Sequence, residues 1–297
     1  MRTLKRGDVT VQRVVDVERL VVAADEFLTG ASREGVRAEQ SWLGPDFIDP
    51  DTQQLIWSVQ SFLVRTPRQT ILVDTCCGNG RDRGEGNRFH QLNTPYLDNL
   101  AAAGVRPEEV DIVFCTHLHG DHVGWNVQQV DGRWVPTFPN ARYLMGRTEY
   151  EFWREAVPRG IGSYGTRAAF DDSVMPIVAA GLAVLVDTDR GSVHELDGSM
   201  VLENLPGHTP GQAGLHIRSP QGDILISGDA IHHPVQVANP AWHSWADVDS
   251  DASTSTRRGM IERYGDTDTV ILTAHFRAPT AGRIVSHGNG ARFAFQS

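Results

Sequence analysis

One short segment of the chain holds three imidazoles and one carboxylate: His117, His119, Asp121 and His122. It follows directly on the apolar run Ile112–Cys115, which is typical of a buried strand. Imidazoles and carboxylates lose hydration when they are buried, so packing alone explains such a cluster poorly. A metal ion compensates for that loss, and His and carboxylate are common zinc ligands. The segment therefore predicts a metal site at the end of a strand.

Three more residues of ligand type stand later in the chain: His208, Asp229 and His275. His208 lies within the turn Pro206–Gly211, Asp229 follows Gly228, and His275 comes after an apolar run. Each position is one where a predicted strand runs out into a turn. Because rigid sheet edges can aim side chains at one point, we expect all seven residues to converge.

The elements that position these residues follow from the apolar periodicity. Strands are predicted at Ser58–Arg65, Thr70–Asp74, Ile112–Cys115, Arg142–Met145, Met200–Leu205, Gly214–Arg218, Asp223–Ser227 and Thr269–Thr273. Helices are predicted at Tyr96–Ala103, Thr148–Ala156, Phe170–Ala180 and Ala252–Tyr264. This interleaving favours an α/β fold of two packed sheets with helices outside. With no dividing linker or low-complexity stretch, we expect residues 1–297 to form a single domain.

One segment, Val22–Gln54, contains no predicted helix or strand but carries aromatic residues such as Phe27, Trp42 and Phe47. Loops of this length in compact domains are usually functional or disordered. The aromatic residues favour a lid or a dimer contact, with a plain surface loop as the alternative.

Composition limits the classes of function. The formal net charge is −10 and no Lys/Arg cluster stands out, so we expect no nucleic-acid partner. No apolar run approaches the roughly 20 residues of a membrane span, and the charged N-terminal stretch does not resemble a signal peptide. Three cysteines are too few for a disulfide framework, so we expect reduced, buried thiols. These observations predict a cytoplasmic protein without a membrane partner.

Together the motifs resemble the metallo-β-lactamase superfamily, whose pattern is His-X-His-X-Asp-His followed by His, Asp and His. The resemblance spans roughly Val59 to His275 and implies a four-layer αββα sandwich. It assigns His117, His119 and His208 to a first metal and Asp121, His122 and His275 to a second. Asp229 would bridge the two ions. It also implies that Asp74, at the end of the strand Thr70–Asp74, orients a ligand, although turn capping is an alternative for this residue.

The ligand types favour two zinc ions per chain, although manganese, iron or cobalt would tolerate the same set. Two cations about 3.5–4 Å apart lower the pKa of a shared water and hold the resulting hydroxide for attack. The resemblance thus predicts a dinuclear-metal hydrolase. Asp121 is expected both to bind metal and to pass a proton during catalysis.

Residues near Asp229 and His275 resemble methyl parathion hydrolase and the quorum-quenching N-acyl homoserine lactonases. Class B β-lactamases of the common subclass have Cys in place of Asp229, so antibiotic hydrolysis is disfavoured. Flavo-diiron proteins usually have Glu in place of His119, so oxygen reduction is disfavoured as well. We therefore predict a small lactone or ester as substrate, with promiscuity toward organophosphate esters. Many homoserine lactonases have Tyr where this chain has His232, which either contacts the substrate as a catalytic residue or bonds to nearby backbone.

Two other functions are left open. A mononuclear iron oxygenase, like the persulfide dioxygenases of the same fold, would not need metal at Asp121, His122 and His275. A non-catalytic scaffold or sensor would be expected to have lost ligands, whereas here the full set is present. The aromatic N-terminal segment makes a homodimer the expected assembly.

Overall fold

The computed structural model describes residues 3–188, 194–196 and 198–296. The chain divides into two compact units, each assembled from segments that are distant in sequence. Unit 1 contains Glu18–Ser58 and Glu195–Ser297, and unit 2 contains Thr3–Val17 and Val59–His194. The single domain over residues 1–297 stays a prediction.

The first sheet, which lies mostly in unit 2, has the strand order β1-β2-β4-β5-β6-β9-β10. Its strands are β1 (Leu4–Arg6), β2 (Val9–Val22), β4 (Leu55–Arg65), β5 (Thr70–Val73), β6 (Ile112–Cys115), β9 (Arg142–Gly146) and β10 (Ala183–Val186). The predicted strands Ser58–Arg65 and Thr70–Asp74 are confirmed, and they form the antiparallel pair β4 and β5. β5, β6 and β9 are parallel, and Val73 pairs with Phe114. The residues that follow β5 and β6 therefore emerge side by side at one edge of the sheet.

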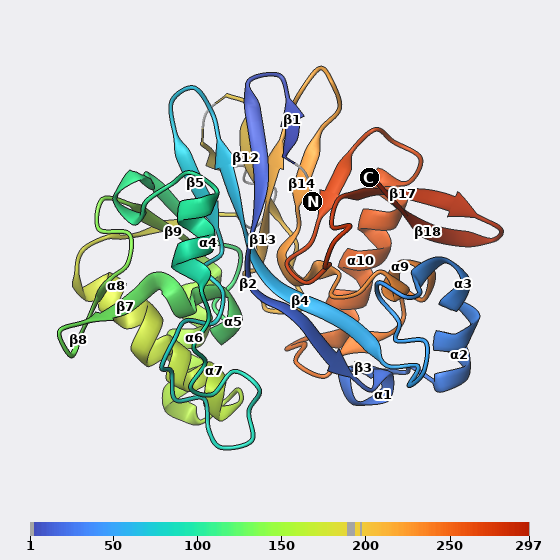
Figure 1. Ribbon diagram of the computed structural model, residues 1–297, viewed down its shortest axis with the longest axis horizontal. Helices are drawn as coiled ribbons and strands as arrows, with labels where there is room; N and C mark the ends of the chain where they lie inside the picture. The colour runs from blue at the N-terminus through green and yellow to red at the C-terminus, as the bar shows by residue number, and fades with distance from the viewer. Residues whose placement is uncertain (1–2, 189–193, 197, 297) are drawn as a thin grey trace. The chain divides into compact units, whose positions relative to one another are not determined.

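Helices of unit 2 follow these strands, and α4, α6, α7 and α8 lie on the left in Figure 1. The α-helices are α4 (Tyr96–Ala102), α5 (Gly120–Val123), α6 (Arg147–Ala156), α7 (Tyr164–Ala169) and α8 (Met175–Ala179). Short 3-10 helices occupy Pro107–Glu109, Gly124–Asn126 and Val157–Arg159, and β7 (Val127–Val130) pairs with β8 (Arg133–Pro136). The predicted uniform helix Phe170–Ala180 is wrong in detail, because a π-helix spans Phe170–Val174 before α8 begins. Pro176 in the first turn of α8 has no N–H to donate, so the regular ladder is interrupted there.

The sheet of unit 1 has the order β11-β12-β13-β14-β16-β17-β18. Its strands are β11 (His194–Glu195), β12 (Met200–Asn204), β13 (Ala213–Ile217), β14 (Ile224–Ile226), β16 (Val270–Leu272), β17 (Gly282–His287) and β18 (Gly290–Phe295). β14 and β16 are parallel, and Ile226 pairs with Leu272. Their carboxyl ends lead into Asp229 and His275, which this pairing brings to the same edge of the sheet.

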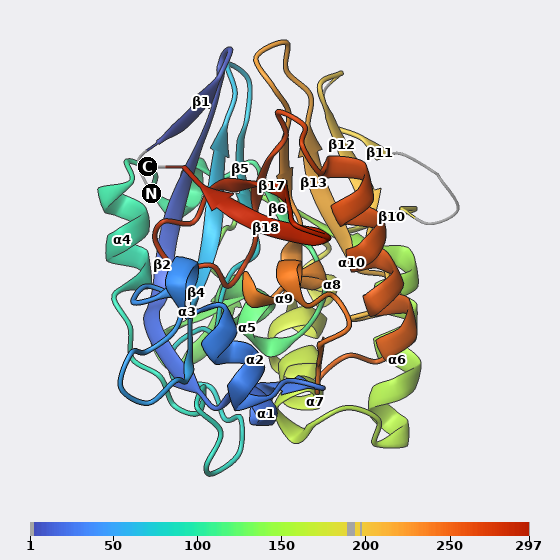
Figure 2. The same cartoon turned by 90° about the vertical axis from the view of Figure 1, so that its right-hand side faces the viewer.

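The segment Val22–Gln54 is not the loop that the sequence suggested, because it folds onto unit 1 as short elements. It contains α1 (Ala24–Phe27), β3 (Leu28–Thr29), α2 (Arg33–Ala38) and α3 (Gln40–Leu43). β3 pairs with β15 (His243–Ser244), and in Figure 2 the three helices lie below β17 and β18. Phe27 and Phe47 are buried, so the segment contributes to the core of the unit. Its role as a lid or dimer contact stays a prediction.

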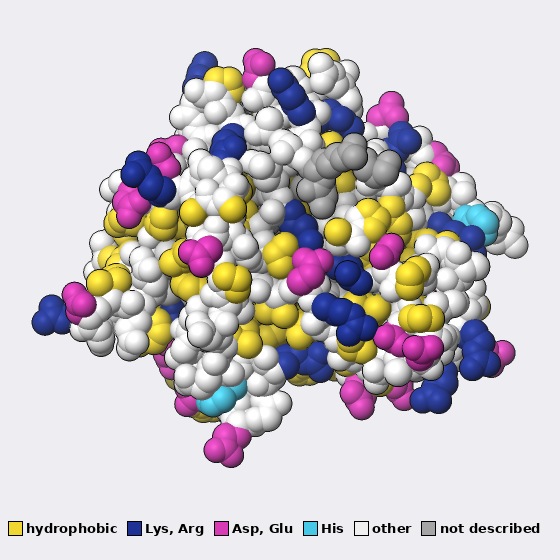
Figure 3. Space-filling model, viewed as in Figure 1, with side chains coloured by type: hydrophobic (Ala, Val, Ile, Leu, Met, Phe, Trp, Pro, Cys, Tyr) yellow, Lys and Arg dark blue, Asp and Glu magenta, His cyan; other side chains and the backbone are white. Residues whose placement is uncertain are grey.

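Unit 1 also contains the 3-10 helix η5 (Gly228–Ala230), α9 (Val235–Ala238) and α10 (Ser250–Tyr264). Asp249 caps α10 by accepting a hydrogen bond from the backbone N–H of Ala252 at 2.9 Å. Among the described residues, no helix has the length and hydrophobicity to cross a membrane. Acidic and basic side chains both occur across the face of the molecule shown in Figure 3.

Candidate metal centre

In unit 2 the predicted ligands lie on the turn from β6 into α5. The rings of His117 and His122 have centroids 4.0 Å apart, and those of His117 and His119 are 4.8 Å apart. Nε2 of His122 lies 3.9 Å from Oδ2 of Asp121. The three histidines are buried and Asp121 is half-buried. The turn thus gathers four groups of ligand type.

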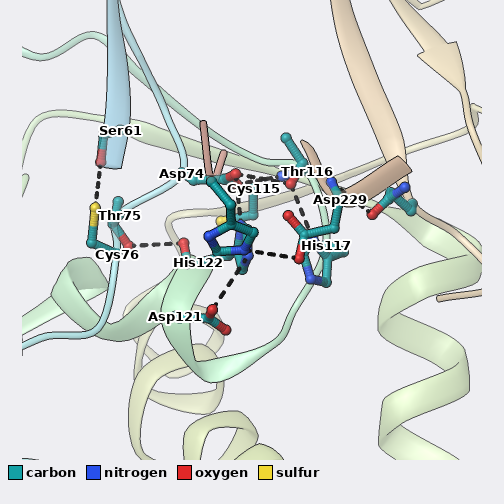
Figure 4. A network of polar contacts seen from close by, with 12 residues as sticks. Ser61, Asp74, Thr75, Cys76, Cys115, Thr116, His117, Asp121, His122 and Asp229 are labelled. Atoms are coloured by element: carbon teal, nitrogen blue, oxygen red, sulfur yellow. Dashed lines mark hydrogen bonds and ion pairs between the residues drawn. The ribbon is translucent and has the colours of Figure 1, made fainter. Parts of the chain in front are cut away.

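Asp74 holds this turn in place from the neighbouring strand end (Figure 4). Its Oδ1 accepts a hydrogen bond from the backbone N–H of Thr116 at 2.7 Å, and its Oδ2 accepts one from the Thr116 hydroxyl at 2.9 Å. Nδ1 of His122 also lies 2.9 Å from Oδ2. Because a carboxylate only accepts hydrogen bonds, the proton of His122 sits on Nδ1 and the lone pair on Nε2 is available to a metal. The orienting role predicted for Asp74 matches this geometry.

A second buried carboxylate, Glu149 on α6, supports the same turn. Its Oε1 accepts hydrogen bonds from the backbone N–H of Leu118 at 3.1 Å and from Nε1 of Trp153 at 2.7 Å. The Trp153 ring packs 5.4 Å from the ring of His119, centroid to centroid. Glu149 was not found from the sequence, because a Glu in an amphipathic helix carries no local signal of burial.

In unit 1 three imidazoles surround one carboxylate oxygen. Oδ2 of Asp229 lies 3.1 Å from Nε2 of His275, 3.3 Å from Nε2 of His232 and 3.5 Å from Nε2 of His208. The ligand atoms of Asp229, His208 and His232 all lie within 4.8 Å of one another, close enough for one ion. The backbone N–H of Asp229 donates to Oε1 of Gln212 at 3.2 Å, which fixes the turn after β14.

Two of these imidazoles are anchored through Nδ1. In His275 this nitrogen lies 2.8 Å from the carbonyl oxygen of Ser58, and in His208 it lies 2.7 Å from Oδ1 of Asp247. Burial raises the pKa of Asp247, but the hydrogen bond and charge of His208 lower it more, to about 2. Asp247 is therefore a carboxylate that accepts the Nδ1 proton. The sequence analysis missed this residue, since no motif surrounds it.

His232 differs from the anchored histidines. Among the described residues its Nδ1 has no hydrogen-bond partner, while its ring packs edge-on against Phe27 with centroids 5.6 Å apart. Phe27 in turn stacks on Trp57 at 5.1 Å. Burial lowers the pKa of His232, and the nearby Asp229 offsets this only in part. Burial therefore favours the neutral form of the His232 ring, which lies beside the Asp229 carboxylate.

The donor set fits divalent metal ions of the zinc type. His122, His208 and His275 each have Nδ1 turned to an oxygen acceptor, which leaves Nε2 as the ligand atom. This arrangement of a metal-binding imidazole and its oxygen partner is general in zinc proteins. Three imidazoles are buried around the Asp229 carboxylate, and buried polar groups are costly unless they have partners. A bound cation would supply such a partner. Buried side chains of metal-ligand type are therefore present in both units.

The predicted site residues thus fall into two sets: His117, His119, Asp121 and His122 in unit 2, and His208, Asp229, His232 and His275 in unit 1. Each set is assembled within its own unit, and the convergence of all seven ligands stays a prediction. Trp125 and Phe276, which follow the candidate ligands closely in sequence, are buried core residues. Trp125 stacks on Tyr96, and Phe276 packs against Phe293.

Comparison with known proteins identifies the family. The model of the metallo-β-lactamase superfamily matches residues 56–275, well over half of the chain. The N-acyl homoserine lactonase AttM of Azorhizobium caulinodans is 30% identical over 236 residues, which cover 73% of this chain and 81% of the relative. AttM of Rhizobium radiobacter is also 30% identical, over 60% of this chain and 63% of its own length. The predicted resemblance is confirmed.

Two solved structures share the fold over nearly the whole chain. The hydrolase AbOPH of the β-lactamase superfamily has a TM-score of 0.80 and 23% identity, and the alignment covers 99% of this chain and 97% of the other. AidC, described as a dizinc quorum-quenching lactonase in complex with a product, has a TM-score of 0.79 and 22% identity, covering 100% and 97%. The predicted fold class is therefore confirmed as the mixed α/β metallo-β-lactamase fold.

These relatives are hydrolases, so the hydrolase interpretation is favoured over the oxygenase alternative. This chain is a metal-dependent hydrolase that belongs to the metallo-β-lactamase superfamily.

Proposed function

We propose that the chain is a dinuclear zinc lactonase whose seven ligands act as one centre. The assignment follows the family pattern: His117, His119 and His208 hold one ion, Asp121, His122 and His275 hold the other, and Asp229 bridges them. The substrate is a small lactone or ester, and the pocket also accepts organophosphate esters.

The observation that carries this proposal is the anchoring of imidazoles through Nδ1. Oxygen acceptors from Asp74, Asp247 and Ser58 set the ring orientation of His122, His208 and His275, respectively. Ligands held this rigidly lose little conformational freedom on binding metal, so the site is prepared for ions before they arrive.

When bound, the two ions supply an activated water and stabilise negative charge that develops on the substrate. The side chains of the chain supply the remaining functions. Asp121, half-buried next to His122, would accept a proton and return it to the leaving oxygen. His232, a neutral imidazole with an uncommitted Nδ1, can donate to or accept from the substrate and so position it.

The substrate class rests on the relatives. Curated proteins that match this chain are named N-acyl homoserine lactonases, and AidC is described as a lactonase. The substitution of His232 for the Tyr of many homoserine lactonases bears on specificity, because an imidazole is shorter than a phenol and can be either donor or acceptor.

A metal-loaded activity panel tests the proposal. The full chain, reconstituted with zinc, is assayed against acyl homoserine lactones, simple lactones, aryl esters and phosphotriesters, and its metal content is counted by elemental analysis. We expect close to two ions per chain, since seven ligands exceed what one tetrahedral ion uses, and turnover of lactones. A single iron per chain with oxygen-dependent turnover of a persulfide would instead support the oxygenase. No turnover of any ester or lactone would refute the substrate assignment.

The cytoplasmic location, the homodimer and the lid role of residues 22–54 stay predictions. Sedimentation of the full chain tests the dimer directly.

A further inference from the structure

The carboxylate that anchors His208 belongs to a buried polar chain that leads away from the metal ligands. Nδ1 of His208 meets Oδ1 of Asp247 at 2.7 Å, and the Asp247 side chain is fully buried. The hydroxyl of Ser253, on the first turn of α10, helps to lower the pKa of Asp247. The same hydroxyl oxygen accepts a hydrogen bond from Nη2 of Arg257 at 3.1 Å. We call Asp247, Ser253 and Arg257 the Asp247 network.

Arg257 supplies the positive charge of this network. Its side chain is completely buried on α10, and its guanidinium is attracted to the charge of Asp247. Nη1 donates to the carbonyl oxygen of Pro240 at 2.9 Å, which fixes the direction of the guanidinium. A buried carboxylate is costly unless positive charge or hydrogen bonds compensate it, and Arg257 provides such compensation.

The backbone of the His208 turn is tied to the same region. The N–H of Val248 donates to the carbonyl oxygen of His208 at 2.9 Å, and the N–H of Asp249 donates to that of Gly207 at 3.0 Å. Gly207 has φ +131°, and a Cβ there would lie 2.1 Å from the backbone nitrogen of Ser253. Only glycine permits this approach of the turn to α10. His208 is thus held both by hydrogen bonds of its backbone and by the contact of its side chain with Asp247.

We propose that the Asp247 network is the positioning network of the His208 ligand and sets the affinity of the ion that His208 binds. Asp247 keeps the Nδ1–H tautomer of His208, so that Nε2 faces the metal, and the buried positive charge of Arg257 stabilises the Asp247 carboxylate. The inference rests on the proposed metal centre and adds residues that the amino-acid sequence by itself did not indicate.

Asp247→Asn tests this role with little change in shape. An amide lacks the charge and presents a donor where the carboxylate had only acceptors, so His208 loses its fixed tautomer. Zinc is removed from the full chain, and the affinity of each site is then measured by competition with a chelator. We expect one of the two ions to bind about 10- to 100-fold more weakly, the usual cost of removing such a partner. The absorption spectrum of the cobalt-substituted protein should change as well, because its bands report ligand geometry at the ion.

The Ser253→Ala variant tests whether Ser253 affects zinc binding through Asp247. It removes only a hydroxyl and should weaken the same ion by a few-fold, less than Asp247→Asn does. Because Ser253 acts through Asp247, the double variant should bind zinc about as weakly as Asp247→Asn alone. Additive losses in the double variant would overturn the proposed chain of action.

Asp223→Asn is the matched control. Asp223 also pairs with an imidazole, since its Oδ2 lies 2.9 Å from Nε2 of His216, but it belongs to a separate polar cluster with Glu203. We expect its zinc affinities and cobalt spectrum to equal those of the wild type. Equal losses in Asp223→Asn and Asp247→Asn would assign the effect to general stability and overturn the inference.

Different results would contradict the proposed function and the inference about the Asp247 network. If the wild type binds no metal, the proposed function falls. If the wild type binds two ions and a folded Asp247→Asn variant, checked by circular dichroism, binds both with unchanged affinity, only the inference about the Asp247 network falls.

Discussion

Acid should destabilise the protein through one buried imidazole, His233. This residue lies in unit 1, where its Nε2 is 2.9 Å from the carbonyl oxygen of Phe47 and its Nδ1 accepts the backbone N–H of Val235 at 3.2 Å. The neutral ring with its proton on Nε2 satisfies both contacts. A second proton on Nδ1 would face the Val235 N–H, so the charged form loses a hydrogen bond as well as its hydration.

The magnitude follows from linkage. Burial lowers the pKa of His233 to about 4, from an ordinary value of 6.5. The unfolded chain therefore binds this proton more readily than the folded chain, and the free energy of unfolding falls as the pH drops below 6.5. For these pKa values the loss is about 2 kcal/mol at about pH 5 and about 3 kcal/mol at about pH 4. Above about pH 7.5 His233 has no such effect.

Urea unfolding of the wild type and of His233→Gln measures how much of the pH-dependent free energy of unfolding comes from His233. A glutamine amide can donate to the Phe47 carbonyl and accept from Val235 without titrating, so the variant should lose about 2 kcal/mol less than the wild type between about pH 7.5 and pH 5. His287→Gln, at an exposed position of unit 1, is the control and should follow the wild type. Parallel pH profiles for the wild type and His233→Gln would refute the assignment of acid lability to this ring.

Four further predictions concern the site and the thiols. Asp229→Ala should remain folded by circular dichroism but hydrolyse almost no substrate at saturating zinc, because the bridge between the ions is lost, and wild-type turnover would contradict the bridging role. His232→Ala should lower kcat/KM for lactones by about ten- to a hundredfold, or about 1.4–2.7 kcal/mol, with metal content unchanged. A loss of metal in that variant would make His232 a ligand instead. Asp74→Asn should weaken the ion bound by His122 about 10- to 100-fold in chelator competition, and equal affinity would remove its orienting role. The three free cysteines are buried and burial raises the pKa of each thiol, so a thiol reagent should modify them only after urea unfolding; rapid labelling of the native chain would contradict this.

The sequence was sufficient for those parts of the protein whose signal is local. The placement of the candidate ligand residues at strand ends could be predicted because His117, His119 and His122 stand within a few residues of a recognisable apolar strand. The parallel pairs β5 with β6 and β14 with β16 bear out that placement, since they bring Asp74 beside Thr116 and His275 beside Asp229. Short alternating segments were harder to assign. The strand β2 and the hairpin of β17 and β18 were not predicted, because their periodicity is weaker than that of a continuous apolar run.

Only the tertiary structure decided which groups form hydrogen bonds with the candidate ligand side chains. Asp247 is 39 residues from His208, and the carbonyl oxygen of Ser58 is 217 residues from the ring of His275. Nothing in the local sequence distinguishes such an aspartate or carbonyl from any other, because the contact exists only once the chain has folded back on itself. The same holds for Phe27, which comes from a segment that reads as a loop yet packs its ring against His232. Ligand identity is a property of residue type and spacing, whereas tautomer, orientation and charge compensation depend on neighbours in space.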